Sequence, residues 1–203
     1  MKKKTKKKLY SIVGAVLLVL AGITIAYAAL SATLNVTVNK LTMTSVGLDV
    51  HFKTESVTAT KANTNNGSTT DIVCGTATSS GSEVTVADTT LDLPGDKCTY
   101  TLTVENTGAL PVKLTGIAKK GSESACGTIS GASYTCGNIT YKLTTDAAGT
   151  TALSTSSAPT LAASTGTQTI YLVVMHKDHD ASGLVSSATS YSNMGFSLTY
   201  TQQ

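Results

Sequence analysis

Apolar and polar residues alternate one by one along most of the chain that follows an apolar N-terminal segment. The clearest cases are 98–105, where Tyr100, Leu102 and Val104 fall on one face, and 195–202 (GFSLTYTQ). In an extended strand this period places the apolar side chains on one side only. Strands with turn residues and no helical pattern between them predict an all-β chain, a single β-sandwich of jelly-roll or immunoglobulin-like topology.

Thr and Ser make up about 29 % of the chain, and Thr is β-branched and favours strands. The stretch 168–176 (QTIYLVVMH) is the most apolar and is expected at the centre of a sheet. The predicted strands are 32–38, 46–53, 83–87, 98–105, 112–118, 139–144, 168–176 and 195–202. Loops rich in polar residues are expected near 60–82, 119–135 and 146–165.

The N-terminus has the three parts of a secretory signal peptide. Six Lys lie in the first eight positions, an apolar run follows from Leu9 to Ile25, and Ala26-Tyr27-Ala28 has the small-x-small form of a cleavage site. We therefore expect a signal peptide over 1–28, cleavage after Ala28, and a β-sandwich domain over 29–203 that is secreted or displayed on the cell surface. The alternative is retention as a membrane anchor, because the apolar run is close to the roughly 20 residues that span a bilayer.

Removal of the N-terminal segment reverses the charge of the chain. The remaining part has nine Lys against 12 acidic residues, a net charge of about −3, and the chain contains no Arg. The net positive charge of the full sequence therefore comes from the N-terminal targeting segment, and nucleic acid is not an expected partner. Contact with a membrane is expected only through the N-terminal segment.

Four cysteines follow the N-terminal segment: Cys74, Cys98, Cys126 and Cys136. An even number in an exported chain predicts disulfides, and three pairings are possible. We favour Cys126–Cys136, which closes a short loop, together with Cys74–Cys98. Four free thiols are the alternative, and a zinc site is less favoured because the chain has no Cys-x-x-Cys pair.

Several segments carry a family resemblance. Leu93-Pro94-Gly95-Asp96, then a strand, then Val104-Glu105-Asn106-Thr107-Gly108, resembles the "PGD … v.N.G" segment of TasA and camelysin-like (CalY) proteins of Gram-positive bacteria. The C-terminal 193–202 resembles the closing strand of that family, and 24–34 resembles the end of its signal peptides, which a dedicated signal peptidase cuts. The four cysteines and the Ser/Thr-rich loops depart from the family pattern.

The resemblance implies a jelly-roll subunit of extracellular biofilm-matrix fibres, in which an N-terminal strand freed by signal cleavage completes the sheet of the next subunit. Here that strand would be 29–38, which is short, uncharged and alternating, and such a segment can pair with an open sheet edge. A head-to-tail contact of this kind propagates into a filament. The expected partner is the chain itself, with other matrix or surface components possible, and the alternative is that 29–38 pairs within its own subunit. The donated positions would be Ala29, Leu30, Ala32, Leu34, Val36 and Val38.

Camelysin-like proteins, which the chain resembles, are described as metallopeptidases, so the resemblance makes a metal-dependent peptidase an alternative. The His-Glu-x-x-His motif of the common zinc peptidases is absent from the sequence. The one candidate metal site consists of His176, Asp178 and His179, with Asp180 as a further candidate ligand, and the competing interpretation is a solvated polar loop. His51 is expected to be a half-buried packing residue.

The sequence also lacks a Gly-x-Ser-x-Gly nucleophile elbow in an α/β pattern and a Gly-rich phosphate loop that opens a helix. We therefore predict no enzyme and no cofactor. The favoured hypothesis is a fibre-forming matrix subunit. A membrane-anchored surface or adhesion module comes second, and a metal-dependent peptidase comes third.

Overall fold

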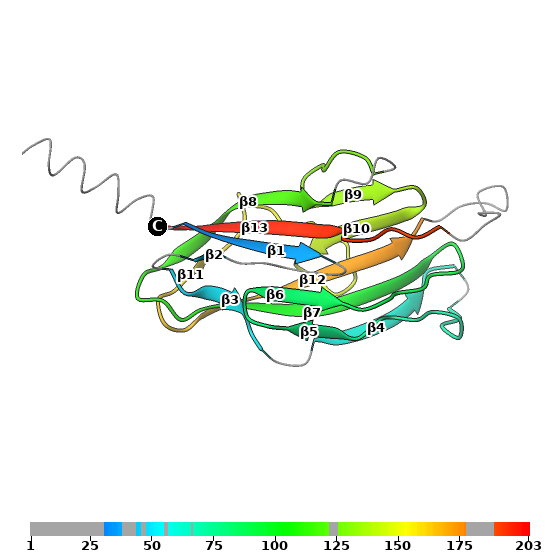
Figure 1. The fold of residues 1–203 in the computed structure, drawn as a ribbon, viewed down its shortest axis with the longest axis horizontal. Coiled ribbons are helices and arrows are strands. Elements are labelled where there is room, and N and C mark those ends of the chain that lie inside the picture. Colours follow the sequence, from blue (N-terminus) through cyan, green and yellow to red (C-terminus); the bar gives the residue numbers. More distant parts are fainter. Residues whose placement is uncertain are drawn as a thin grey trace, which may run out of the picture.

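The structure is a computed structural model in which two β-sheets pack face to face (Figure 1). It describes residues 31–37 and 44–45 by their backbone, and 48–54, 57–65, 67–121, 126–177 and 189–203 in full. The predicted signal peptide, 1–28, lies outside these ranges. No helix in the described ranges has the length and apolarity needed to cross a membrane.

Sheet A has seven strands and sheet B has six. The order in sheet A is β11 (Thr160–Leu161), β8 (Val112–Lys120), β13 (Gly195–Gln202), β1 (Ser31–Thr37), β6 (Glu83–Val86) and β5 (Ala77–Ser79), with β2 (Thr44–Ser45) also paired to β1. The order in sheet B is β3 (Val50–Phe52), β7 (Asp96–Asn106), β12 (Gly166–His176), β10 (Ile139–Thr144) and β9 (Ser133–Cys136), with β4 (Thr58–Asn63) also paired to β7.

The all-β sandwich predicted from the alternation is confirmed. From β7 onward the chain crosses between the sheets at every step except the β9–β10 hairpin: β7, β10 and β12 lie in sheet B, while β8, β11 and β13 lie in sheet A. Immunoglobulin-like sandwiches keep consecutive strands such as F and G in one sheet. The crossings are therefore those of a jelly roll, with β3 to β6 placed between the first strand and β7.

The core lies between the sheets and is built from the inward residues of alternating strands. β7 shows the pattern well, because Tyr100, Leu102 and Val104 are all at most 1 % exposed. The two sheets meet where Tyr134 of β9 stacks on Tyr141 of β10 and packs against Phe196 of β13, each at 5.1 Å between ring centroids. Burial raises the pKa of Tyr141 to about 12.

The structure contains strands that the alternation did not predict. β5 lies inside the stretch expected as a loop over 60–82, and β4 overlaps its start. β9 overlaps the end of the expected loop 119–135, and β11 lies within the expected loop 146–165. Residues 58–61 of β4 are all exposed, so no apolar face marks this strand in the sequence. It forms because its backbone pairs with β7, and β7 is identified by its own apolar pattern.

Candidate functional site: the first strand and its channel

The first strand, β1, lies inside sheet A with a neighbour on each side (Figure 1). It runs antiparallel to β13 from Ser31, opposite Thr201, to Thr37, opposite Gly195. On its other side it is parallel to β6 over residues 35–37, and β2 pairs with residues 32 and 33. Within one chain, β1 thus occupies its own subunit's sheet, which is the alternative placement considered from the sequence. Of the predicted donated positions, Ala29, Leu30 and Val38 lie outside the described residues.

We call the space that β1 fills between β13 and β6 the β1 channel. The apolar positions of β1 pair with residues of β13 that are completely buried: Ala32 with Tyr200, Leu34 with Leu198, and Val36 with Phe196. On the β6 side Val36 pairs with Val84, which is 1 % exposed. Removal of β1 would therefore open the middle of sheet A and bring a row of core residues next to water.

The Pro94-Gly95-Asp96 turn is organised by the Asp96 carboxylate, which is 1 % exposed. One oxygen accepts hydrogen bonds from the backbone N–H groups of Asp92 (3.0 Å) and Leu93 (2.8 Å), and the other accepts from Asn63 Nδ2 at 2.6 Å. Gly95 has a φ of +87°, which an L side chain rarely adopts. The aspartate of this motif is thus a structural residue that holds the turn to the end of β4.

Asn106 has the same kind of role at the other end of β7. Its side chain is fully buried; Nδ2 lies within donating distance of three backbone carbonyls, and Oδ1 accepts from the N–H of Gly108 at 3.1 Å. The carbonyls are those of Leu110 (2.8 Å), Ala162 (3.0 Å) and Leu161 (3.3 Å). One amide therefore ties the end of β7 to the entrance of β8 and to β11.

Both disulfides have the pairing favoured from the sequence. Cys74 is bonded to Cys98 of β7, and Cys126 is bonded to Cys136 of β9. The described residues contain no free cysteine. Two disulfides indicate that the protein folds in an oxidising environment.

His51 has two acidic neighbours that the sequence analysis did not identify. Its Nδ1 is 3.0 Å from Asp49 Oδ1, and its Nε2 is 2.9 Å from Glu105 Oε1. Only a ring protonated on both nitrogens can donate to both carboxylates. Asp49 could have been found as a partner, because residues i and i+2 of a strand share a face. Glu105 could not, because it comes from β7, 54 residues away.

The contribution of Asp49 to stability should depend on pH, and this can be tested. The Thr107 hydroxyl donates a hydrogen bond to Asp49, and this is the main reason why the pKa of Asp49 lies below its usual value. His51 lowers the pKa further, while partial desolvation acts in the opposite direction. A carboxylate whose pKa is lowered by folding stabilises the folded state above about pH 4, and this stabilisation is lost as the pH falls through the pKa of the folded state. We expect Thr107→Val to reduce the free energy of unfolding at pH 6 and to reduce it less at pH 2, measured by urea denaturation. An equal reduction at both pH values would contradict this assignment.

Of the residues in the predicted metal site, the structure describes only His176. His176 is 3 % exposed, and its Nδ1 is 3.0 Å from the carbonyl oxygen of Lys177, to which it donates. Asp178, His179 and Asp180 lie outside the described residues. Within the described ranges, no group of three or more His, Cys, Asp or Glu side chains has a metal-binding arrangement.

The fold and this site define a jelly-roll sandwich with two disulfides, whose N-terminal strand fills a central position of one sheet. Comparison with protein-family models, with curated proteins and with solved structures finds no match to the chain.

Proposed function

We propose that this chain is an exported structural subunit that polymerises when β1 moves from its own sheet into the β1 channel of another copy. The observation that carries the proposal is the position of β1: it precedes all other described strands, yet it lies between two neighbours in sheet A. The resemblance of the Leu93–Asp96 and Val104–Gly108 segments to TasA and camelysin-like fibre proteins supports the same role. We propose no catalytic activity.

Exchange between copies can reuse the contacts that β1 makes with β13 and β6. The hydrogen bonds that β1 makes to β13 and β6 within one chain can form in the same register between two chains, as in domain swapping. Twelve residues, 38–49, lie between β1 and β3, and an extended chain of that length reaches about 40 Å. These residues include β2, so exchange also requires that the pairing of β2 with residues 32 and 33 is broken or is made with the incoming β1. A copy that gives its β1 to one neighbour and takes β1 from another propagates a filament.

A crosslink at the β1–β13 pair tests whether β1 is exchanged. Asn35 lies opposite Ser197 in this pair, and we expect the Asn35→Cys/Ser197→Cys variant, starting at Ala29, to form polymers under mild reduction. After reoxidation, a non-reducing denaturing gel should show a ladder of covalent multiples, because the bond then joins two chains. Oxidation of the monomer before assembly should instead lock β1 in its own sheet and prevent polymerisation.

The matched control moves one cysteine to a strand pair that does not exchange. Ala118 of β8 also lies opposite Ser197, so Ala118→Cys/Ser197→Cys crosslinks within one chain whatever β1 does. Polymers of this control should run as monomers after oxidation, and its oxidised monomer should still assemble. Polymers of the Asn35 variant that also give only monomers would exclude exchange of β1.

A membrane-anchored surface module is the second candidate. The placement of β1 within its own subunit favours it, because sheet A is then complete without a partner. This candidate predicts that Met1 remains on the protein in the membrane fraction and that no filaments form. N-terminal sequencing of the exported form together with electron microscopy separates the two candidates.

A further inference from the structure

A subunit without its own β1 must keep the β1 channel open until another copy's strand enters. The β13 wall of the channel is secured by its pairing with β8 along its length. The β6 wall is less well supported, since β6 has only β1 on one side and the three-residue strand β5 on the other. The channel can therefore accept a strand only if other contacts hold the β5–β6 hairpin in position when β1 is absent.

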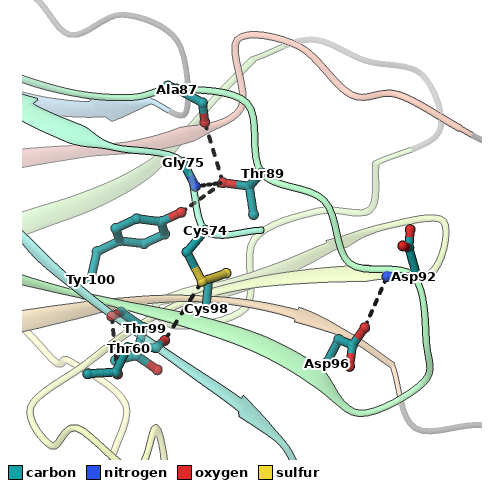
Figure 2. The surroundings of a disulfide bond; sticks show 10 residues. All are labelled: Thr60, Cys74, Gly75, Ala87, Thr89, Asp92, Asp96, Cys98, Thr99 and Tyr100. Atoms are coloured by element: carbon teal, nitrogen blue, oxygen red, sulfur yellow. Dashed lines mark hydrogen bonds between the residues drawn. A yellow bond between two sulfur atoms is a disulfide. The ribbon is translucent and has the colours of Figure 1, made fainter. Parts of the chain in front are cut away.

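We propose that the Cys74–Cys98 disulfide and the adjacent Thr89–Tyr100 hydrogen bond form a brace that holds the β6 wall in place for an incoming β1 from a second copy. This inference rests on the proposed function. It assigns a role in partner binding to a disulfide and a hydroxyl group that lie outside the channel itself. Figure 2 shows the brace: Cys74 is bonded to Cys98, and the Tyr100 hydroxyl reaches the hydroxyl of Thr89.

Both ends of the hairpin are attached to β7, and at neighbouring positions. Cys74 precedes β5 by three residues and is bonded to Cys98, which is completely buried. Thr89 follows β6 by three residues, and its hydroxyl is 2.7 Å from that of Tyr100, which is also completely buried. Both ends of the hairpin are therefore attached to buried residues in the first half of β7, a core strand.

The two attached segments are also tied to each other. The Thr89 hydroxyl accepts from the N–H of Gly75 at 3.2 Å, and Val73 and Thr90 exchange backbone hydrogen bonds of 3.0 and 2.8 Å. A Cβ atom on Gly75 would come within 2.2 Å of the carbonyl oxygen of Ala87, so only glycine allows this approach. The brace is thus one closely packed unit rather than two separate contacts.

At its tip the hairpin contacts β3, through a 2.7 Å hydrogen bond from the N–H of Phe52 to the carbonyl of Gly81. None of these attachments includes β1. The described contacts can therefore keep β6 near its place when β1 leaves, and a binding site that is already ordered loses less conformational entropy when it takes up a strand. Without the brace the base of the hairpin would have to be ordered by each incoming strand.

Strand uptake by the full mature chain tests the inference. We would add a fluorescent synthetic peptide of residues 29–40 to the oxidised protein starting at Ala29, and measure uptake by anisotropy and polymer growth by light scattering. For the Cys74→Ser/Cys98→Ser variant we expect both to fall by about tenfold or more, because the acceptor wall is no longer ordered. The Cys126→Ser/Cys136→Ser variant is the matched control, since it also loses one disulfide but not the brace, and its uptake should stay within about threefold of wild type.

Different results would overturn the two proposals. A wild-type chain that neither takes up the peptide nor polymerises would exclude the proposed function itself. Uptake by the wild type together with undiminished uptake by a folded Cys74→Ser/Cys98→Ser variant would exclude the brace alone. If that variant does not fold, Tyr100→Phe and Thr89→Val decide, because they remove the hydroxyl contact and keep the disulfide: the brace predicts reduced uptake by both, and wild-type uptake by both would exclude it.

Discussion

Asn106→Asp is expected to destabilise the fold by about 3 kcal/mol or more at pH 7, because it places a carboxylate against three backbone carbonyls in a fully buried site. The wild-type amide satisfies those carbonyls as a donor and the N–H of Gly108 as an acceptor. An ionised carboxylate can still accept from the N–H of Gly108, but it cannot donate to the three carbonyls. Chemical denaturation followed by circular dichroism measures the loss directly.

The pH dependence of this variant distinguishes the mechanism from a general packing defect. Burial among carbonyls raises the pKa of the introduced carboxyl above its unfolded value, because only the protonated form can donate. Stability relative to wild type should therefore be highest below about pH 4 and should be lost as the pH rises through the folded-state pKa. A difference from wild type that does not change between pH 4 and pH 7 would contradict the donor role of Asn106.

Asn65→Asp makes the same chemical change at an exposed position. Asn65 also donates to a backbone carbonyl, that of Pro94 at 3.0 Å, but its side chain is open to water. Water can solvate the new carboxylate and the carbonyl, so we expect a loss below about 1 kcal/mol. A similar loss in both variants would mean that burial of the Asn106 amide is not the cause.

The alternation of apolar and polar residues predicted the positions of strands that bury one face in the core. It located β7, β12 and β13 within two residues of their ends, and it predicted that 168–176 would be central in its sheet. These strands are identifiable because each contributes several fully buried apolar residues to the core. The same reasoning fails for β4, whose pairing depends on the backbone of β7 and leaves no apolar face in the sequence.

The candidate site was only partly predictable for a different reason. Alternation identifies the first strand but contains no information about its neighbours, because pairing with β13 joins residues more than 150 positions apart. The resemblance to fibre proteins identified Asp96 and Asn106 without giving their physical roles. Their hydrogen bonds show that both act on the ends of β7, the strand to which the brace is attached.

The second large effect is expected at Asp96. Asp96→Asn should lower the free energy of unfolding by about 2–4 kcal/mol, because an amide cannot reproduce the contacts of the carboxylate. One carboxylate oxygen accepts two backbone N–H groups while the other faces the Nδ2 group of Asn63 at 2.6 Å. In either orientation of the new amide, its NH₂ group faces a donor in a site that is 1 % exposed.

A compensating change tests this explanation. Adding Asn63→Asp to Asp96→Asn restores one donor and one acceptor across the pair, so thermal unfolding should show a partial recovery of stability, limited by the lost hydrogen bond from Asn63 to the carbonyl of Pro94. Asp92→Asn is the charge control, because Asp92 lies in the same turn with an exposed side chain and should change stability by less than about 0.5 kcal/mol. If Asp92→Asn destabilised the protein as much as Asp96→Asn, the effect would come from net charge and not from the buried carboxylate that holds the turn.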